Sequence, residues 1–369
     1  MDITEISDKR KGYYMMKRIF AFCLCVILLL TGCAVNTDNE GVQTSGKDST
    51  TEVETSHIAT AQTTEETIST DIEKDKWNVP IDYTWNPHVY GDIMKELYGE
   101  EIEEDLYRLI DAVLAREESC DFDVSNEAVI SDLQFITTLI CPLFDKLVND
   151  YSFEAGTVSF EYKYDKAQHD EVINKFKDRI EYIICSSVKE TDNQTMTALA
   201  IYHYYSGIIT YDYAAMDDIY ADVSTYRALV EYEGVCQSFA GAYAYLLLQC
   251  GIPAVDISSY NKNLAHAWTL VKLNGNYYHM DPTYEEGYGG AGLKCFGMTN
   301  EVREFYDYPV ENFNVLNIWW GSDIKADDDR FSDLRCIEVV DKIVRDESGM
   351  TIYGANGEDE QNASVLIPY

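Results

Sequence analysis

A two-residue turn signal, Asn274-Gly275, lies between two segments that read as β-strands. Asn-Gly between such segments is the strongest short-range signal for a β-hairpin, because both residues tolerate the positive φ of a tight turn. The sequence therefore predicts two antiparallel strands, at 266–273 and 276–281, joined by this turn. In that register His266 and Asp281 lie on one face, one diagonal step apart and within reach of a hydrogen bond.

The segment before the hairpin predicts a helix with a cysteine in or just before its first turn. Gly234-Val235-Cys236 leads into an apolar run, and the helix is expected to end at Gly251 because Pro253 prevents its continuation. A thiol there lies near the positive end of the helix dipole and near unpaired N–H groups, which lower its pKa. Taken alone, such a cysteine is more often a buried structural residue than a nucleophile.

The combination of Cys236, His266 and Asp281 changes this interpretation. A predicted strand at 254–259 leads from the helix to the hairpin. The helix supplies a thiol, and the hairpin supplies an imidazole with a carboxylate that can orient it. A nucleophile, a base and a group that orients the base are the parts of a catalytic triad. His279 lies on the same strand as Asp281; we expect it to point to the opposite face and to be structural.

Four short segments around these residues form a recognisable pattern. They are Gly-Val-Cys-Gln-Ser-Phe-Ala at 234–240, Ala-His-Ala-Trp at 265–268, Gly-Asn-Tyr-Tyr at 275–278 and Met-Asp-Pro-Thr at 280–283. Together they resemble the transglutaminase-like superfamily over about a third of the chain, roughly from Thr195 to Asn300. The resemblance implies a papain-like α+β fold in which Cys236, His266 and Asp281 are the catalytic triad.

Two features depart from the family pattern or do not match it. Tyr284 stands where the family often has Trp, an aromatic-for-aromatic change that leaves the chemistry untouched. No residue upstream of Cys236 matches the family's oxyanion-hole donor. The backbone N–H of Cys236 is the best single candidate, and a second donor is unassigned.

The first 32 residues have the pattern of an export signal. Lys17-Arg18 precede an apolar run from Ile19 to Leu30, which is too short for a membrane span of about 20 residues. The ending Leu30-Thr31-Gly32-Cys33 resembles the lipobox of bacterial lipoproteins, which implies that Cys33 becomes the lipidated first residue of the mature chain. A plain signal peptide with an incidental cysteine is the alternative. We therefore expect an extracytoplasmic protein anchored to the bacterial cell membrane through Cys33.

The remaining sequence divides into four regions. Residues 33–76 are rich in Ser and Thr and contain no aromatic residue, which is typical of a disordered tether. We expect an α+β support region at 77–190, the catalytic domain at 191–310, and a C-terminal extension at 311–369 that packs on the core. Within them the predicted elements are helices at 98–116, 131–149 (broken by Pro142), 169–187, 195–213 and 226–231, and strands at 158–164, 337–344 and 350–353.

The charge of the chain limits its partners. It has 65 acidic and 28 basic residues, a formal net charge of −37. This excludes a sequence-independent nucleic-acid binder, because such binding depends on Lys and Arg that neutralise phosphates. We expect a protein or peptide substrate, and the acidity favours basic, Lys-bearing substrates over anionic wall polymers.

The cysteine count leaves at least one free thiol. Of ten cysteines, Cys23 and Cys25 leave with the signal and Cys33 is lipidated, so an odd number remains. Cys236 is the natural candidate for the free thiol. The other six can form three disulfides or remain buried free thiols, and their spacing does not decide between these.

The resemblance implies a thioester mechanism. His266 takes the proton of Cys236, the thiolate attacks a carboxamide or peptide carbonyl, and Asp281 orients the ring. Water as acceptor gives hydrolysis or deamidation, whereas a lysine amine gives an isopeptide cross-link, and the triad does not decide between them. Two alternatives stay open: a cysteine peptidase or amidase acting on peptide or cell-wall peptide bonds, and a catalytically silent lipoprotein that binds peptides or wall polymers. We expect no cofactor and no metal site.

Overall fold

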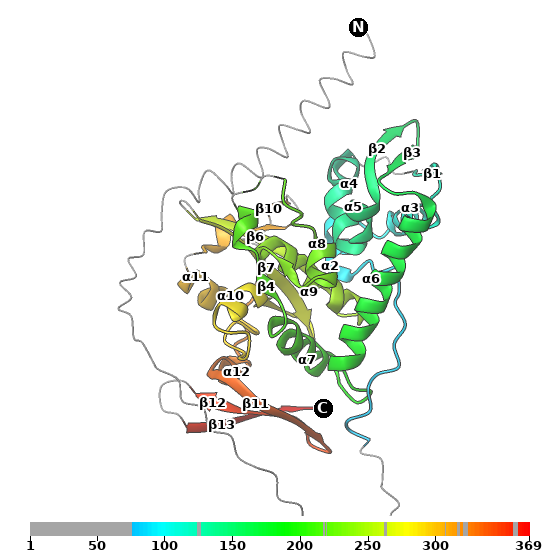
Figure 1. Cartoon of the computed structure of the whole chain (residues 1–369). Helices are drawn as coiled ribbons and strands as arrows, with labels where there is room; N and C mark the ends of the chain where they lie inside the picture. Colours follow the sequence, from blue (N-terminus) through cyan, green and yellow to red (C-terminus); the bar gives the residue numbers. More distant parts are fainter. Residues whose placement is uncertain are drawn as a thin grey trace, which may run out of the picture.

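The protein is an α+β structure, as the sequence predicts. A computed structural model describes residues 76–369, apart from 124–126, 217, 219, 262–263, 307, 316–317, 320–323 and 357–360. The predicted export signal, the lipidation residue Cys33 and the tether up to residue 75 lie outside the described residues. Helices gather around a central antiparallel sheet, and smaller sheets lie toward the two ends of the described chain (Figure 1).

The central sheet has the strand order β10-β9-β6-β7-β8, and its neighbouring strands run antiparallel. The predicted hairpin is present as β7 and β8, and both turn residues, Asn274 and Gly275, have the positive φ (50° and 85°) that the turn requires. The strands are β6 Ala254–Asn261, β7 Leu264–Leu273, β8 Asn276–Met280, β9 Asn314–Val315 and β10 Ile318–Trp319.

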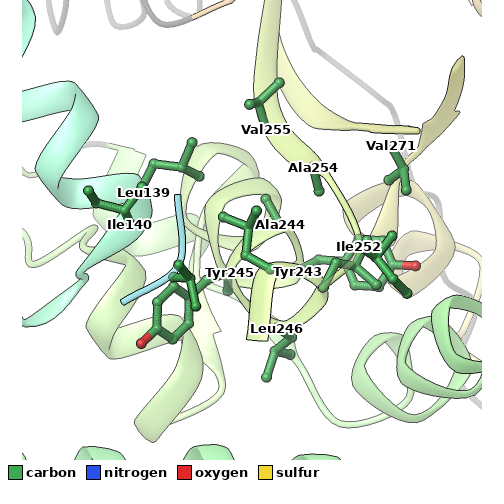
Figure 2. Packing of buried hydrophobic residues seen from close by; sticks show 14 of the residues in the cluster. Leu139, Ile140, Tyr243, Ala244, Tyr245, Leu246, Ile252, Ala254, Val255 and Val271 are labelled. Carbon is green, nitrogen blue, oxygen red and sulfur yellow. The ribbon is translucent and has the colours of Figure 1, made fainter. Parts of the chain in front are cut away.

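Helix α9 (Cys236–Gln249) is the centre of the core. Every side chain from Ser238 to Gln249 is buried, because the helix packs against β6 and β7 on one side and against α8 (Thr225–Val230) and α4 (Glu127–Ile140) on others. Figure 2 shows α9 side chains between Leu139 and Ile140 of α4 and side chains of β6 and β7. A helix that is apolar on all faces is stable only when other elements cover it on all sides. The core therefore fixes the position and direction of α9.

The N-terminal half combines helices with a small sheet, ordered β1-β3-β2 (Figure 1). The predicted helix at 98–116 begins too early: Gly99, with φ of 92°, separates two helices. The predicted break at Pro142 is confirmed, but the strand that begins at Val148 replaces the end of the predicted second helix. The elements are α2 Asp92–Tyr98, α3 Glu103–Ala115, β1 Ser119–Asp121, α5 Leu143–Leu147, β2 Val148–Glu154, β3 Thr157–Tyr162 and α6 Lys166–Ser187.

The predicted helix at 195–213 is too long. Helix α7 (Gln194–Ser206) ends before Gly207, and the chain then forms the short strand β4 (Thr210–Tyr211). This strand pairs in parallel with β5 (Glu233–Gly234), directly before α9. The pairing joins segments far apart in sequence, so tertiary contact overrides the helical spacing here.

The C-terminal region forms a separate three-stranded sheet, ordered β11-β12-β13 (Figure 1). Backbone hydrogen bonds join it to the preceding region: Leu293 N–H donates to the carbonyl of Ile337 at 3.0 Å, and Val340 N–H to that of Ala291 at 2.7 Å. In the described part of the chain, no helix has the length and apolar character needed to cross a membrane. The elements are α10 Pro282–Gly287, α11 Asn300–Phe305, α12 Ser332–Arg335, β11 Ile337–Asp346, β12 Gly349–Asn356 and β13 Gln361–Pro368.

Candidate active site

Cys236 is the first residue of α9, as predicted, and follows Val235 in extended backbone. Gly234 permits this entry into the helix, because a Cβ at that position would lie only 2.8 Å from the Cβ of Ser238. The hydroxyl of Ser238 accepts the N–H of Val235 at 3.3 Å and donates to the carbonyl of Val223 at 2.6 Å. The thiol is thus held, half-buried, at the positive end of a fixed helix.

The hairpin brings His266 and Asp281 together. Strands β7 and β8 pair in the predicted register, with Leu273 opposite Asn276. The Nε2 atom of His266 lies 2.7 Å from Oδ2 of Asp281, so the predicted hydrogen bond is present. Both side chains are buried, which strengthens an interaction between charged groups.

The thiol of Cys236 hydrogen-bonds to the His266 ring. Since Asp281 engages Nε2, the ring nitrogen left for the sulfur is Nδ1. Burial alone would raise the pKa of Cys236, but the hydrogen bond and charge of His266, with a backbone N–H from Ala267, outweigh burial and lower it. Burial alone would lower the pKa of His266, whereas Asp281 and Cys236 raise it to about 9. Both shifts move the pair toward a thiolate and an imidazolium.

The backbone and side chain of Asp281 are both anchored. As the N-cap of α10, its Oδ1 accepts the N–H of Tyr284 at 3.0 Å. Its own N–H donates to the carbonyl of Cys295 at 3.0 Å, and its carbonyl accepts the hydroxyl of Tyr202 at 3.1 Å. These contacts leave Oδ2 to face His266.

Two cations set the ionisation of Asp281. Burial alone would raise the pKa of the carboxyl, but the charges of His266 and of Arg303 outweigh it and lower the pKa to about 2. The carboxylate is therefore ionised throughout the neutral range.

Tyr211 is a residue of the site that the sequence analysis missed. Its hydroxyl accepts the backbone N–H of Cys236 and donates to the thiol. Burial raises the pKa of Tyr211, so the hydroxyl keeps its proton and remains a donor. Tyr211 reaches Cys236 because β4 pairs with β5, at Glu233–Gly234. The tyrosine lies within a segment whose helical spacing hid this strand pairing.

The prediction that His279 faces away from Asp281 is wrong, because residues two apart in a strand share a face. His279 Nδ1 accepts the indole N–H of Trp268 at 2.9 Å, and its Nε2 lies 2.8 Å from Oδ1 of Asn300. Burial lowers the pKa of His279 to about 3, so the ring is neutral. It links the hairpin to α11, which is a structural role.

The other described cysteines lack the environment of Cys236. All seven cysteines in the described residues are free thiols. Burial raises the pKa of Cys141 and of Cys250 to about 12, in contrast to Cys236. Over the described ranges, no group of three or more His, Cys, Asp or Glu side chains is arranged to hold a metal ion.

Comparisons with known proteins identify the domain that carries this site. The sequence model of the transglutaminase-like superfamily matches residues 183–282, which include Cys236, His266 and Asp281. No curated protein sequence matches the chain.

Three solved structures are similar to part of this chain at low sequence identity. A candidate cysteine protease from Cytophaga hutchinsonii is 19% identical over 36% of this chain and 55% of its own, with a TM-score of 0.25. A protein named a TGase is 14% identical over 45% of this chain and 50% of its own, with a TM-score of 0.27. A candidate protease from Parabacteroides distasonis is 13% identical over 35% of this chain and 29% of its own, with a TM-score of 0.24. The chain thus spans about half or less of each.

The sequence match and the mixture of helices with an antiparallel sheet agree with the papain-like α+β fold that the resemblance implies. Residues 183–282 of this chain therefore form a transglutaminase-like domain, by their match to the model of that superfamily.

Proposed function

We propose that this chain is a lipid-anchored, extracytoplasmic cysteine enzyme that attacks a glutamine carboxamide or a peptide carbonyl through a thioester intermediate. One observation carries the enzymatic part: the thiol of Cys236, at a helix N-terminus, contacts a buried His266–Asp281 pair. Membership in a superfamily of typically cysteine-based enzymes supports it. The Leu30–Cys33 lipobox pattern supports the anchor and the location.

The first half of the reaction forms the thioester. The thiolate of Cys236 attacks the carbonyl carbon, a C–S bond forms, and the carbonyl oxygen takes up negative charge. As the tetrahedral intermediate collapses, the C–N bond breaks and His266 gives its proton to the departing ammonia or amine. Asp281 holds the ring so that Nδ1 stays directed at the sulfur.

The second half transfers the acyl group. Water or a primary amine attacks the thioester carbonyl while the now neutral His266 takes its proton, and the C–S bond breaks. Water gives an acid, and a lysine amine gives an amide cross-link. The acidity of the chain favours approach of Lys-bearing proteins or peptides as substrates.

Two donors are available for the negative oxygen. The backbone N–H of Cys236 is one, once a bound carbonyl oxygen takes the place of the Tyr211 hydroxyl that accepts it, and that hydroxyl is the second. A carbonyl oxygen bound beside this N–H would meet the hydroxyl as well. Donors fixed where charge develops supply a large share of enzymatic rate acceleration.

A product analysis tests the enzymatic proposal and identifies the acceptor. The protein is incubated with a glutamine peptide and a primary amine, and the products are measured by mass spectrometry. We expect conversion of the peptide: an amine adduct demonstrates transfer, whereas deamidation or a cut backbone demonstrates hydrolysis. If neither occurs across a panel of Gln- and Lys-bearing peptides and the peptides bind unchanged, the chain is a binding protein and the enzymatic proposal is wrong.

Lipidation has its own test at Cys33. The Cys33→Ala variant, expressed in a bacterium that processes lipoproteins, is expected to lose fatty-acid labelling and to move from the membrane fraction to the soluble one. An acyl chain contributes about 0.8 kcal/mol per buried CH₂, so its loss removes the anchor. The Cys25→Ala variant changes a cysteine within the apolar run and should keep the label. Retention of the label in Cys33→Ala would disprove the lipobox interpretation.

A further inference from the structure

Arg303 of α11 is a buried arginine directly behind the proposed triad. Its side chain has no exposed surface, and its Nη1 lies 2.9 Å from Oδ2 of Asp281. The same oxygen is 2.7 Å from Nε2 of His266. One carboxylate oxygen therefore faces two cationic side chains, while Oδ1 accepts the backbone N–H of Tyr284.

Four aromatic rings surround the guanidinium of Arg303. Its central carbon lies 4.0 Å from the ring centre of Trp268, 4.8 Å from Tyr308, 5.2 Å from Tyr284 and 5.8 Å from Tyr306. An arginine at such distances is attracted by the negative faces of the rings, and more strongly where water is excluded. The rings thus fix the guanidinium in one place.

Three of these four rings also contact the imidazole of His266. Tyr284 stacks on it with ring centres 4.5 Å apart and planes 16° apart, and Tyr308 lies at 5.5 Å. Trp268 is also stacked, at 5.9 Å. Three rings therefore contact both Arg303 and His266, so a change at Arg303 affects the imidazole through packing as well as through Asp281.

Stability alone does not account for this arrangement. The Nε and Nη2 atoms of Arg303 have no hydrogen-bond partner among the residues that the structure describes. A buried donor without a partner costs free energy, and well-packed apolar residues often replace buried ion pairs without loss of stability. Native proteins keep such costly buried polar groups mainly at functional sites.

We propose that Arg303 is a positioning residue for the triad, which fixes the Asp281 carboxylate against His266 and offsets part of its negative charge. The role deepens the function proposed above and depends on it. Within the described part of the chain Arg303 contacts Asp281 and the four rings, so it acts on the reaction through Asp281 and His266.

The direction of the effect follows from the charges that face His266. Removing the guanidinium leaves a full negative charge at Asp281. This charge stabilises the imidazolium and opposes formation of the thiolate. Both ionisations of the Cys236–His266 pair therefore move to higher pH. The groups facing the imidazole and its carboxylate are Cys236 from α9, Tyr284 and Glu285 from α10, Arg303 from α11, Tyr202 from α7, and Cys295 and Tyr308 from the connecting segments.

The test is the pH dependence of Cys236 alkylation by iodoacetamide in the full chain, followed by mass spectrometry of the labelled peptide. The profile has two limbs: the acid limb follows ionisation of the Cys236 thiol, and the alkaline limb follows loss of the proton from the His266 imidazolium. In Arg303→Met both limbs are expected to shift upward by about one pH unit, the usual size for a nearby charge. Arg303→Lys keeps the charge and should keep the limbs, while its shorter, non-planar head group lowers the alkylation rate. Arg303→Gln removes the charge but can still donate to Asp281, and serves if the Met variant does not fold.

The matched control is Arg345→Met. Arg345 is also buried and pairs with an aspartate, with its Nε 2.6 Å from Oδ1 of Asp192. It lies on β11, and its polar contacts within the described residues are with Asp192 and the carbonyl of Ser187. Its loss is expected to lower the melting temperature and to leave both limbs in place. An unshifted or downward-shifted profile in folded Arg303→Met or Arg303→Gln would overturn the role of Arg303 alone. An ordinary cysteine profile in the unmodified chain would overturn the proposed function, and this role with it.

Discussion

Replacement of Cys236 by Ala is expected to abolish conversion of glutamine peptides, by roughly 10⁴-fold or more in kcat, the scale seen when the nucleophile of a triad is removed. In the proposed mechanism the thiolate forms the covalent bond of the intermediate, and among the described residues neither Cys141 nor Cys250 has a lowered pKa that would let it take over this role. Cys236→Ser is expected to be similarly inactive, because the hydroxyl does not ionise as the thiol does. The measurement is the rate of adduct or acid formation by mass spectrometry.

Cys250→Ala is the matched control for this experiment. Cys250 is also half-buried and lies at the other end of α9, but burial raises its pKa to about 12. Its replacement should keep the activity close to that of the unmodified chain. Circular dichroism and the melting temperature show whether each variant is folded. A folded Cys236→Ala variant with full activity would disprove the catalytic role of the thiol.

The part of the site that lies on the hairpin could be predicted because its determinants are local. Asn274-Gly275 specifies a two-residue turn, and a two-residue turn fixes which residues lie opposite each other. The contact between His266 and Asp281 follows from that register. The start of α9 at Cys236 is similarly marked, by a glycine before it and an apolar run after it.

The position of Tyr211 could not be predicted, because it depends on a long-range strand pair. The residues from 208 to 213 continue the apolar spacing of α7, and a helix through them is a consistent interpretation of that pattern. Gly207 and the parallel pairing of β4 with β5 end the helix instead. Parallel pairs join distant segments, so no turn signal marks them.

The burial of Arg303 has no signature in the sequence either. Arginines are mostly exposed, and Arg303 lies on a six-residue helix with no recognisable motif. Its position depends on α11 packing against β8 and on the four rings that enclose its side chain. Such a residue becomes visible only when the tertiary contacts of Asp281 are known.

Replacement of Asp281 by Asn is expected to lower kcat by roughly 10²- to 10⁴-fold while the chain remains folded, as in triads where the orienting aspartate becomes an amide. Asn has nearly the same shape, and its Oδ1 can still accept the N–H of Tyr284 at the start of α10. Its amide nitrogen, however, can donate toward Nε2 of His266, which favours the tautomer with the proton on Nδ1. That tautomer cannot take the proton of Cys236.

The pH dependence of the same variant has a definite sign. Against burial, Asp281 and Cys236 together raise the pKa of His266 to about 9, from an ordinary value of 6.5, and the charge of Asp281 is the largest of the contributions that raise it. Without that charge the imidazolium loses its proton at lower pH. The alkaline limb of both kcat/KM and Cys236 alkylation therefore moves down, toward the ordinary histidine range. Arg303→Met is expected to move the same limb in the opposite direction, since it removes a positive charge from the same carboxylate.

Asp192→Asn is the matched control, because it also removes a buried negative charge but not the one that faces His266. Asp192 has a fully buried side chain and pairs with Arg345, so its replacement costs stability at a distance from the thiol. Its pH profile should match that of the unmodified chain. If Asp281→Asn and Asp192→Asn show the same profile and the same rate, Asp281 is a structural helix cap. Opposite shifts in Asp281→Asn and Arg303→Met can arise only if the charge on this one carboxylate sets the ionisation of the Cys236–His266 pair.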